Sequence, residues 1–319
     1  MRQKPMVFTE RMSANVSLIG HLFSSTSLAL SLPNLYTTVS LTTHKGTKDT
    51  WKISSTERLS YQSIDCYLKH LSYVKSSMGF DGGFFVQSNN SFPMGIGLSS
   101  SSSSYSALTA CAVRAIHSIR GERLLTSHDE LAMLSAEGKY SSRHSFYSPW
   151  SITQDKSATG ASFGAYDDLS HVALVVCSSK KRISIDQIIK LVDNNPMSSQ
   201  YHDNVRKRVL SAQNHIQNKD WKGLFECVWD DFSELHALFH SSKPSFSFQS
   251  DATRHVLQQV KRWWDIYNDG PILVMGLGYV IHLLFRPDQQ TMKDRMLETL
   301  EYFHCIHGTE AKSEVASHT

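Results

Sequence analysis

Residues 91–105, SFPMGIGLSSSSSSY, combine two glycines with a run of six serines. Glycines allow the backbone to turn tightly and to approach a ligand closely, and the free N–H groups at the start of a helix attract anions. Serine hydroxyls add hydrogen-bond donors. The stretch is therefore typical of a loop that holds phosphate. A flexible serine linker and a glycine-rich turn that binds nothing are the alternatives.

The segments on either side of this stretch help to choose between these alternatives. Residues 79–87 have the pattern of a strand, and apolar residues recur at every third or fourth position after the serines. These apolar residues are Tyr105, Leu108, Ala112, Ile116 and Ile119. Their spacing predicts a helix with one buried face. The stretch then joins a strand to a helix, which favours a phosphate loop over a linker.

The remaining elements predict an α+β protein. A length of 319 residues suggests two domains or one large one. Strands are expected around residues 16–18, 38–41, 157–178 (as strand, turn and strand), 271–275 and 279–285. Helices are expected at 64–74, 128–134, 185–192, 203–216, 220–239 and 251–267. The last residues, 307–319, are polar and aperiodic, which predicts a flexible tail.

Composition excludes several classes of protein. With 40% hydrophobic and 19% charged residues, the chain is typical of a folded globular protein. Its net charge of +3 comes from scattered lysines and arginines, which argues against a nucleic-acid partner. The longest apolar runs have the length of a strand, so no membrane span is expected. The N-terminal residues lack the apolar core of a secretory signal, and the cytoplasm is the expected location.

The cysteines and one pair of histidines do not indicate a metal site. The five cysteines include no CxxC pair and are expected to be buried, reduced thiols. His236 and His240 have the spacing of one helical turn, but no third ligand lies near them in the sequence. Structural roles are expected for both.

Several motifs resemble a known family. Residues 93–102, PMGIGLSSSS, resemble the phosphate loop of the GHMP kinase superfamily, P-x-G-x-G-L-x-S-S-A. More narrowly, the chain resembles the diphosphomevalonate decarboxylase family. Five segments resemble the family's motifs in the family's order. Residues 14–19 resemble ANIALIKYWGK, residues 87–98 resemble SSNNFPxxxGL, and residues 134–147 resemble LSRLGSGSxCRSxY. Residues 234–239 resemble ELHxLF, and residues 269–284 resemble GDGPVVTMDAGPNVHLL. The resemblance extends from about residue 13 to residue 286.

This resemblance implies a fold and an activity. It implies a two-lobed α+β GHMP fold with an N-terminal domain like that of ribosomal protein S5 (residues 1–182), a ferredoxin-like C-terminal domain (183–306) and a tail (307–319). The active site would lie in the cleft between the domains. Enzymes of the family use ATP and Mg²⁺ to phosphorylate the tertiary hydroxyl of a phosphorylated mevalonate in isoprenoid biosynthesis. Loss of that phosphate accompanies loss of carbon dioxide and gives isopentenyl diphosphate.

The family's motifs also imply binding residues at matching positions. For the nucleotide these are Gly95, Gly97, Leu98, Ser99, Ser100 and Ser101, with Ser100 also a candidate Mg²⁺ ligand. For the substrate they are Asn15, Ser141, Ser142, Arg143 and His144. The implied partner is a small phosphorylated molecule, with no nucleic acid and no membrane, and a homodimer is left open.

Three charged positions of the family are replaced in this alignment. The Asp of its MDAGPN segment falls on Gly276, the Lys of IKYWGK on Gly20, and the Arg of SGSxCRS on His144. A carboxylate that orients or deprotonates a hydroxyl contributes about 10²–10⁴-fold, so the usual decarboxylation is expected to be weak or absent. His21 and Lys139 are substitutes close in sequence, although plain structural roles are favoured. Gly276→Asp, Gly20→Lys and His144→Arg made together are expected to raise decarboxylation if the scaffold is otherwise competent.

Three functions agree with this pattern. The first is a divergent decarboxylase-family protein that binds ATP and a phosphorylated mevalonate-like substrate. The second is a phosphotransferase like mevalonate 3-kinase, because phosphoryl transfer depends mainly on positioning and electrostatics. The third is a binding protein without catalysis on the same fold. A GHMP kinase for an unrelated small molecule agrees with the phosphate loop but not with the outer motifs.

Overall fold

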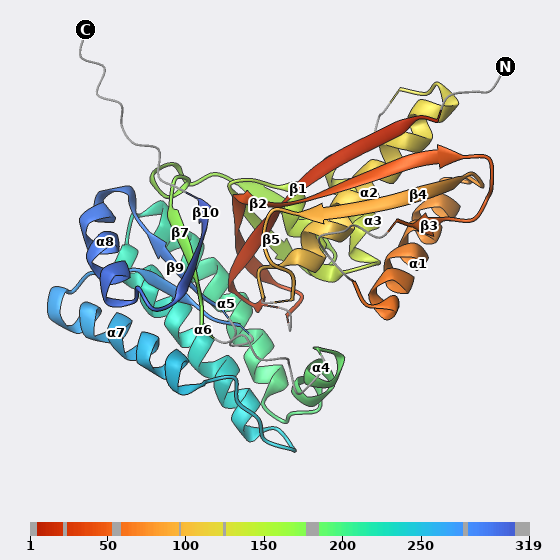
Figure 1. Ribbon diagram of the computed structural model, residues 1–319. Coiled ribbons are helices and arrows are strands. Elements are labelled where there is room, and N and C mark those ends of the chain that lie inside the picture. Colours follow the sequence, from red (N-terminus) through yellow and green to blue (C-terminus); the bar gives the residue numbers. More distant parts are fainter. Residues whose placement is uncertain are drawn as a thin grey trace, which may run out of the picture.

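The computed structural model describes residues 5–21, 24–52, 59–95, 97–123, 126–176, 185–276 and 280–309. Figure 1 shows two lobes, each built on a β-sheet with helices packed against it. This arrangement confirms the expected α+β class. Within the described ranges, no helix is both long enough and apolar enough to cross a membrane.

The first lobe contains the candidate phosphate loop. Its elements are β1 (Val7–Ile19), β2 (Ser27–His44), β3 (Thr50–Trp51), α1 (Tyr61–Ser77), β4 (Gly83–Asn90), α2 (Ser100–Arg120), α3 (His128–Ala136), the 3₁₀ helix η2 (Tyr140–Phe146), β5 (Trp150–Gln154) and β6 (Ser157–Ala161). The strand order is β3-β4-β2-β5-β6, and β1 pairs with β2. The long β2 strand pairs with β4 along residues 37–44 and with β5 along residues 27–30. The strand β2 therefore joins the part of the sheet that contains β4 to the part that contains β5.

The second lobe is a four-stranded antiparallel sheet with helices packed against it. Its elements are η3 (Gly164–Tyr166), β7 (Ser170–Val175), α4 (Ile185–Asp193), α5 (Ser198–Gln217), α6 (Trp221–Ser241), α7 (Asp251–Tyr267), β8 (Ile272–Val274), β9 (Val280–Phe285), η4 (Pro287–Gln289), α8 (Gln290–Thr299) and β10 (His304–Thr309). The strand order is β10-β7-β9-β8. Asp220 and Ser250 cap α6 and α7 with their side chains, which fixes where these two helices begin.

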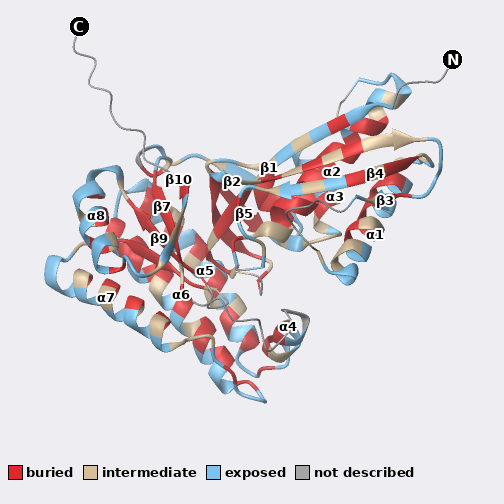
Figure 2. Ribbon diagram, in the orientation of Figure 1, coloured by how far each residue is buried: buried red, intermediate tan, exposed pale blue. Residues whose placement is uncertain are grey.

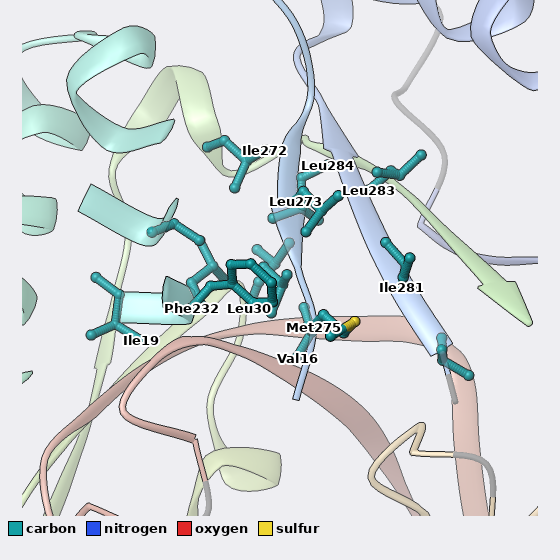
Figure 3. Close-up of a cluster of buried hydrophobic side chains, with 14 of the residues drawn as sticks. Val16, Ile19, Leu30, Phe232, Ile272, Leu273, Met275, Ile281, Leu283 and Leu284 are labelled. Carbon is teal, nitrogen blue, oxygen red and sulfur yellow. The ribbon is translucent and has the colours of Figure 1, made fainter. Parts of the chain in front are cut away.

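A continuous apolar core joins the two lobes. Val16 and Ile19 of β1 and Leu30 of β2 belong to the same buried cluster as Phe232 of α6 and Met275. Figure 3 shows these side chains directed at one another where the ends of β1 and β2 meet the second sheet. Figure 2 shows that buried residues continue across this junction. Because apolar burial contributes about 25 cal/mol per Å², this shared core holds the lobes together.

Most predicted elements are present, with corrections at the C-terminus. The prediction that a flexible tail begins at residue 307 is wrong, because residues 304–309 form β10, which pairs with β7. The strand β7 lies before the boundary expected at 182/183, yet it belongs to the second sheet. The helix α8 was not predicted, because residues 290–299 carry few apolar residues. Among the cysteines expected to be buried, Cys66 is exposed, Cys305 is half-buried, and Cys177 lies outside the described residues.

Candidate functional site

The glycine and serine stretch is the connection between β4 and α2. Gly95 and Gly97 have φ values of +77° and +100°, and Ser99, directly before the helix, has φ of +55°. Such angles favour glycine, which explains the two glycines. A Cβ added at either glycine meets no described atom within 4 Å, so the loop is open on that side. Leu98 is buried and anchors the loop to the core.

The N-terminus of α2 has the properties of an anion site. Within the described part of the chain, the side chain of Ser99 makes no capping hydrogen bond. The first N–H groups of an α-helix have no partner inside the helix, and the helix dipole makes this end positive. Ser99, Ser100 and Ser101 are half-buried at this end. These residues fit the phosphates of a nucleotide, because the two glycines lie directly before the N–H groups of a helix start, which attract anions.

Other serines attach the start of α2 to the rest of the lobe. The hydroxyls of Ser102 and Ser141 are 2.6 Å apart, and Ser106 donates to the carbonyl of Ser142 at 2.7 Å. Ser103 is held by Thr37 of β2 at 2.7 Å. The serine run is therefore a packed helix start, and the linker alternative is wrong. The structure also brings the candidate residue Ser141 next to the candidate phosphate loop.

The other candidate substrate residues of the first lobe are buried. Arg143 of η2 donates to the backbone carbonyls of Tyr140, Asp155 and Ser157, and its guanidinium lies on the Tyr140 ring. Asn15 of β1 donates its amide to the Ser145 hydroxyl at 3.1 Å. Ser142 is paired with a serine of α3. These contacts position η2 against the sheet.

His144 is also enclosed. Its Nε2 lies 2.8 Å from the Ser27 hydroxyl and its Nδ1 lies 2.7 Å from the Ser151 hydroxyl. Burial, with a smaller effect of the neighbouring Arg143 charge, lowers the pKa of His144 to about 3. The ring is therefore uncharged at neutral pH. His144 therefore does not supply, at that pH, the positive charge of the arginine that the family has at this position.

Gly20 lies in a turn that has no room for a side chain. Its φ is +86°, and an added Cβ would lie 2.1 Å from the carbonyl oxygen of Thr26 and 3.0 Å from Ser27. Its N–H donates to the Asp231 carboxylate of α6 at 3.1 Å. The glycine is therefore required by the path of the backbone. Ser27, which touches Gly20, also binds His144, so these two candidate positions are close neighbours.

Gly276 lies beside His21. Among the described residues, an added Cβ at Gly276 would have one neighbour within 4 Å, the Nδ1 atom of His21 at 3.6 Å. The other nitrogen, Nε2, lies 3.8 Å from Oδ2 of Asp231. Gly276 neighbours His21, which follows Gly20 in the chain, and Gly20 neighbours His144 through Ser27. The candidate positions 20, 144 and 276 therefore lie around one region, next to the C-terminal ends of β1 and β8.

His282 links this region to the phosphate loop. It lies on β9, and its Nδ1 is 2.9 Å from Nε2 of His171 on β7. Burial, followed by the neighbouring His21, lowers the pKa of His282 to about 3, against a hydrogen bond with the backbone of Gly97 that raises it. One histidine of the second lobe therefore contacts the loop of the first.

Asp231 is a buried carboxylate that sequence reasoning missed. Burial raises its pKa to about 6, although the Gly20 N–H and the Arg208 charge lower it. Arg208 of α5 lies 3.4 Å from Oδ1. The sequence held a signal for this residue, because Asp231 falls on the apolar stripe of α6 between Val228 and Leu235. A charged residue on a buried face is rare without a partner.

Metal-ligating side chains do not cluster in the described part of the chain. No group of three or more His, Cys, Asp or Glu residues there is arranged to hold a metal ion. His236 is buried, which agrees with the structural role expected for it, and His240 is exposed.

The two lobes and the open loop at the start of α2 define a protein of the GHMP kinase superfamily. A family model of the diphosphomevalonate decarboxylase-like N-terminal domain matches residues 14–165. The crystal structure of mevalonate diphosphate decarboxylase from Legionella pneumophila is 30% identical, with 94% of this chain and 100% of that chain covered and a TM-score of 0.88. The chain belongs to the mevalonate diphosphate decarboxylase family.

Two further structures have the same fold at lower identity. Mevalonate diphosphate decarboxylase from Staphylococcus aureus is 21% identical, with 95% of each chain covered and a TM-score of 0.83. A structure named MDDEF in complex with MVAPP, AMPPCP and magnesium is 19% identical, with 96% of this chain and 98% of that chain covered and a TM-score of 0.81.

Proposed function

We propose that this protein binds Mg-ATP and a phosphorylated mevalonate-type substrate, and that it transfers a phosphoryl group to a hydroxyl of that substrate with little or no decarboxylation. The observation that carries the proposal is the loop at Gly95 and Gly97, where an added Cβ meets no described atom within 4 Å. The loop leads into the start of α2, where, among the described residues, the Ser99 side chain makes no capping hydrogen bond. Family membership supports the substrate class. The complex of MDDEF with MVAPP, AMPPCP and magnesium supports the pair of ligands.

Each ligand has candidate residues. Backbone N–H groups from Gly97 to Ser101 would hold the phosphates of ATP, and the Ser100 hydroxyl would ligate Mg²⁺. Mg²⁺ supplies charge neutralisation between the phosphates. Ser141 lies 2.6 Å from Ser102 and would hold a phosphate of the substrate at the same end of α2.

Decarboxylation is expected to be weak because the three aligned positions, 20, 144 and 276, lack the charged side chains that the family has there. In the alignment with the family, position 276 has no carboxylate and position 20 has no ammonium group. His144 is uncharged at neutral pH, and both of its ring nitrogens contact serine hydroxyls. The Arg143 guanidinium donates to backbone carbonyls. Holding a substrate carboxylate in register needs such a charge, whereas a phosphate loop acts through backbone N–H groups.

The test incubates the protein with Mg-ATP and mevalonate, its 5-phosphate or its 5-diphosphate, and measures ADP and carbon dioxide separately. Reactions with ATP alone serve as the control, and ATP binding is measured by calorimetry. ADP without carbon dioxide is the expected result. Carbon dioxide released at an ordinary enzymatic rate of about 10 s⁻¹ would contradict the proposal. ATP binding without ADP release would indicate a binding protein on the same fold.

A further inference from the structure

His21 occupies an unusual position in the candidate site. It follows Gly20 in the turn after β1, with φ of +31°, and only 9% of its side chain is exposed. Its Nδ1 lies 3.6 Å from the position that a Cβ of Gly276 would take, and its Nε2 lies 3.8 Å from Oδ2 of Asp231. The imidazole thus lies between a buried carboxylate and a position that carries no side chain.

Asp231 is held in place independently of His21. The Gly20 N–H binds Oδ2 at 3.1 Å, and Arg208 lies 3.4 Å from Oδ1. Arg208 also pairs with Glu234 of the same helix as Asp231. A carboxylate fixed beside Nε2 favours the tautomer that carries its proton on Nε2, because negative charge attracts the N–H. Nδ1 then keeps its lone pair and can accept a proton on the side of Gly276.

The acceptor lies close to the candidate phosphate loop. His282 contacts the backbone of Gly97, and the neighbouring His21 lowers the pKa of His282. His282 therefore neighbours both His21 and the loop that would hold a phosphoryl group at the start of α2.

We propose that His21 accepts the proton of the substrate hydroxyl during phosphoryl transfer, and that Asp231 acts as its positioning residue. In this step the hydroxyl oxygen forms a bond to the γ-phosphorus of ATP, and the bond from that phosphorus to the β,γ-bridging oxygen breaks. ADP leaves, and the hydroxyl proton moves to Nδ1 of His21. The imidazolium is stabilised by the Asp231 carboxylate. The inference rests on the proposed function.

The environment of His21 agrees with this role. Burial lowers the pKa of His21 to about 4, so the ring is uncharged at neutral pH and free to accept a proton. Its basicity is then close to that of an ordinary aspartate, with a pKa of about 3.9. A base of this strength is sufficient for phosphoryl transfer through a loose transition state, which depends mainly on positioning and electrostatics.

The decisive test combines His21→Ala with Gly276→Asp. His21→Ala is expected to lower kcat for ADP release by about 10²-fold without changing ATP affinity. The double variant is expected to recover at least about tenfold, because the aspartate enters the space that the imidazole leaves. His255→Ala, at an exposed site on α7, is the matched control and is expected to keep the wild-type rate. Thermal unfolding checks that each variant is folded.

A spectroscopic measurement tests the positioning role of Asp231. Nitrogen NMR of the wild-type protein is expected to show His21 protonated at Nε2 and unprotonated at Nδ1. Asp231→Asn is expected to reduce this tautomer and to lower kcat more than it raises KM. His21 protonated at Nδ1 would overturn the inference.

The kinetic outcomes separate two failures. Full activity of folded His21→Ala, or of His21→Gln if the alanine variant does not fold, would overturn the inference and leave the proposed function intact. Absence of ADP release by the wild-type protein with all three substrates would overturn both.

Discussion

At the scale of single residues, two glycines at similar places in the site have opposite tolerance for a side chain. Gly20 has φ of +86° and would place a Cβ 2.1 Å from the Thr26 carbonyl oxygen. A Cβ added at Gly276 would meet one described atom within 4 Å, Nδ1 of His21 at 3.6 Å. This geometry argues against Gly20→Lys as part of the triple reversion, whose effect on decarboxylation stays a prediction. A lysine there would force the turn after β1 to move.

Gly20→Ala is expected to destabilise the protein by about 2–4 kcal/mol, because strain at positive φ adds to a backbone clash. Gly276→Ala is the matched control and is expected to stay within about 0.5 kcal/mol of the wild type. Urea unfolding followed by circular dichroism measures both free energies. Equal stability of the two variants would show that the turn at Gly20 is more adaptable than its geometry indicates.

At the scale of elements, the two ends of α2 separate backbone strain from ligand binding. Gly97 lies before the N-terminus with φ of +100°, and Gly121 caps the C-terminus with φ of +69°. An added Cβ at either position meets no described atom within 4 Å. A side chain at either glycine would therefore strain the backbone in a similar way, although the two positions lie at opposite ends of the helix dipole.

Gly97→Ala is expected to weaken Mg-ATP binding at least about tenfold, because a shifted backbone misdirects the N–H groups that would hold phosphate. Gly121→Ala is expected to cost about 1 kcal/mol of stability and to leave ATP affinity unchanged. Calorimetric titration measures the affinities and thermal unfolding the stabilities. If both variants bound ATP like the wild type, phosphate would not lie at the start of α2.

At the scale of the whole molecule, buried histidines at the lobe junction make stability depend on pH. Burial lowers the pKa of His21 to about 4 and those of His144, His236 and His282 to about 3. Their unfolded pKa is about 6.5, so the folded state binds fewer protons below that pH, and stability present above pH 6.5 is lost as pH falls. Asp231, with its pKa raised to about 6, acts in the opposite sense: its contribution is lost as pH rises through 6.

The four histidines outweigh the one carboxyl, so Tm is expected to fall steeply between pH 7 and pH 4.5. One buried histidine loses about 2 kcal/mol between pH 7.5 and pH 5. His236→Leu removes one buried histidine and is expected to reduce the fall in Tm. His255→Leu, at an exposed site, is expected to leave the fall in Tm unchanged. Scanning calorimetry across this pH range measures the effect. A Tm that does not change from pH 7 to pH 5 would contradict it.

The sequence by itself determined the local arrangement of the phosphate loop. Glycine spacing, the serine run and the apolar period after Tyr105 depend on near neighbours in the chain, so they predicted the strand, loop and helix of β4 and α2. Strong helical periods likewise predicted α5 and α6. The motifs also indicated the family, because several segments agreed in order and content.

Only the tertiary structure decided what surrounds each candidate residue. Gly20 and Asp231 are 211 positions apart and meet because the β1 turn packs against α6. The pairing of His21 with Asp231, the enclosure of His144 by Ser27 and Ser151, and the contact of His282 with Gly97 arise in the same way. Such contacts leave no periodic signal, because each depends on how separate segments pack. A glycine in the sequence also does not tell whether its missing side chain leaves open space, as at Gly276, or avoids a clash, as at Gly20.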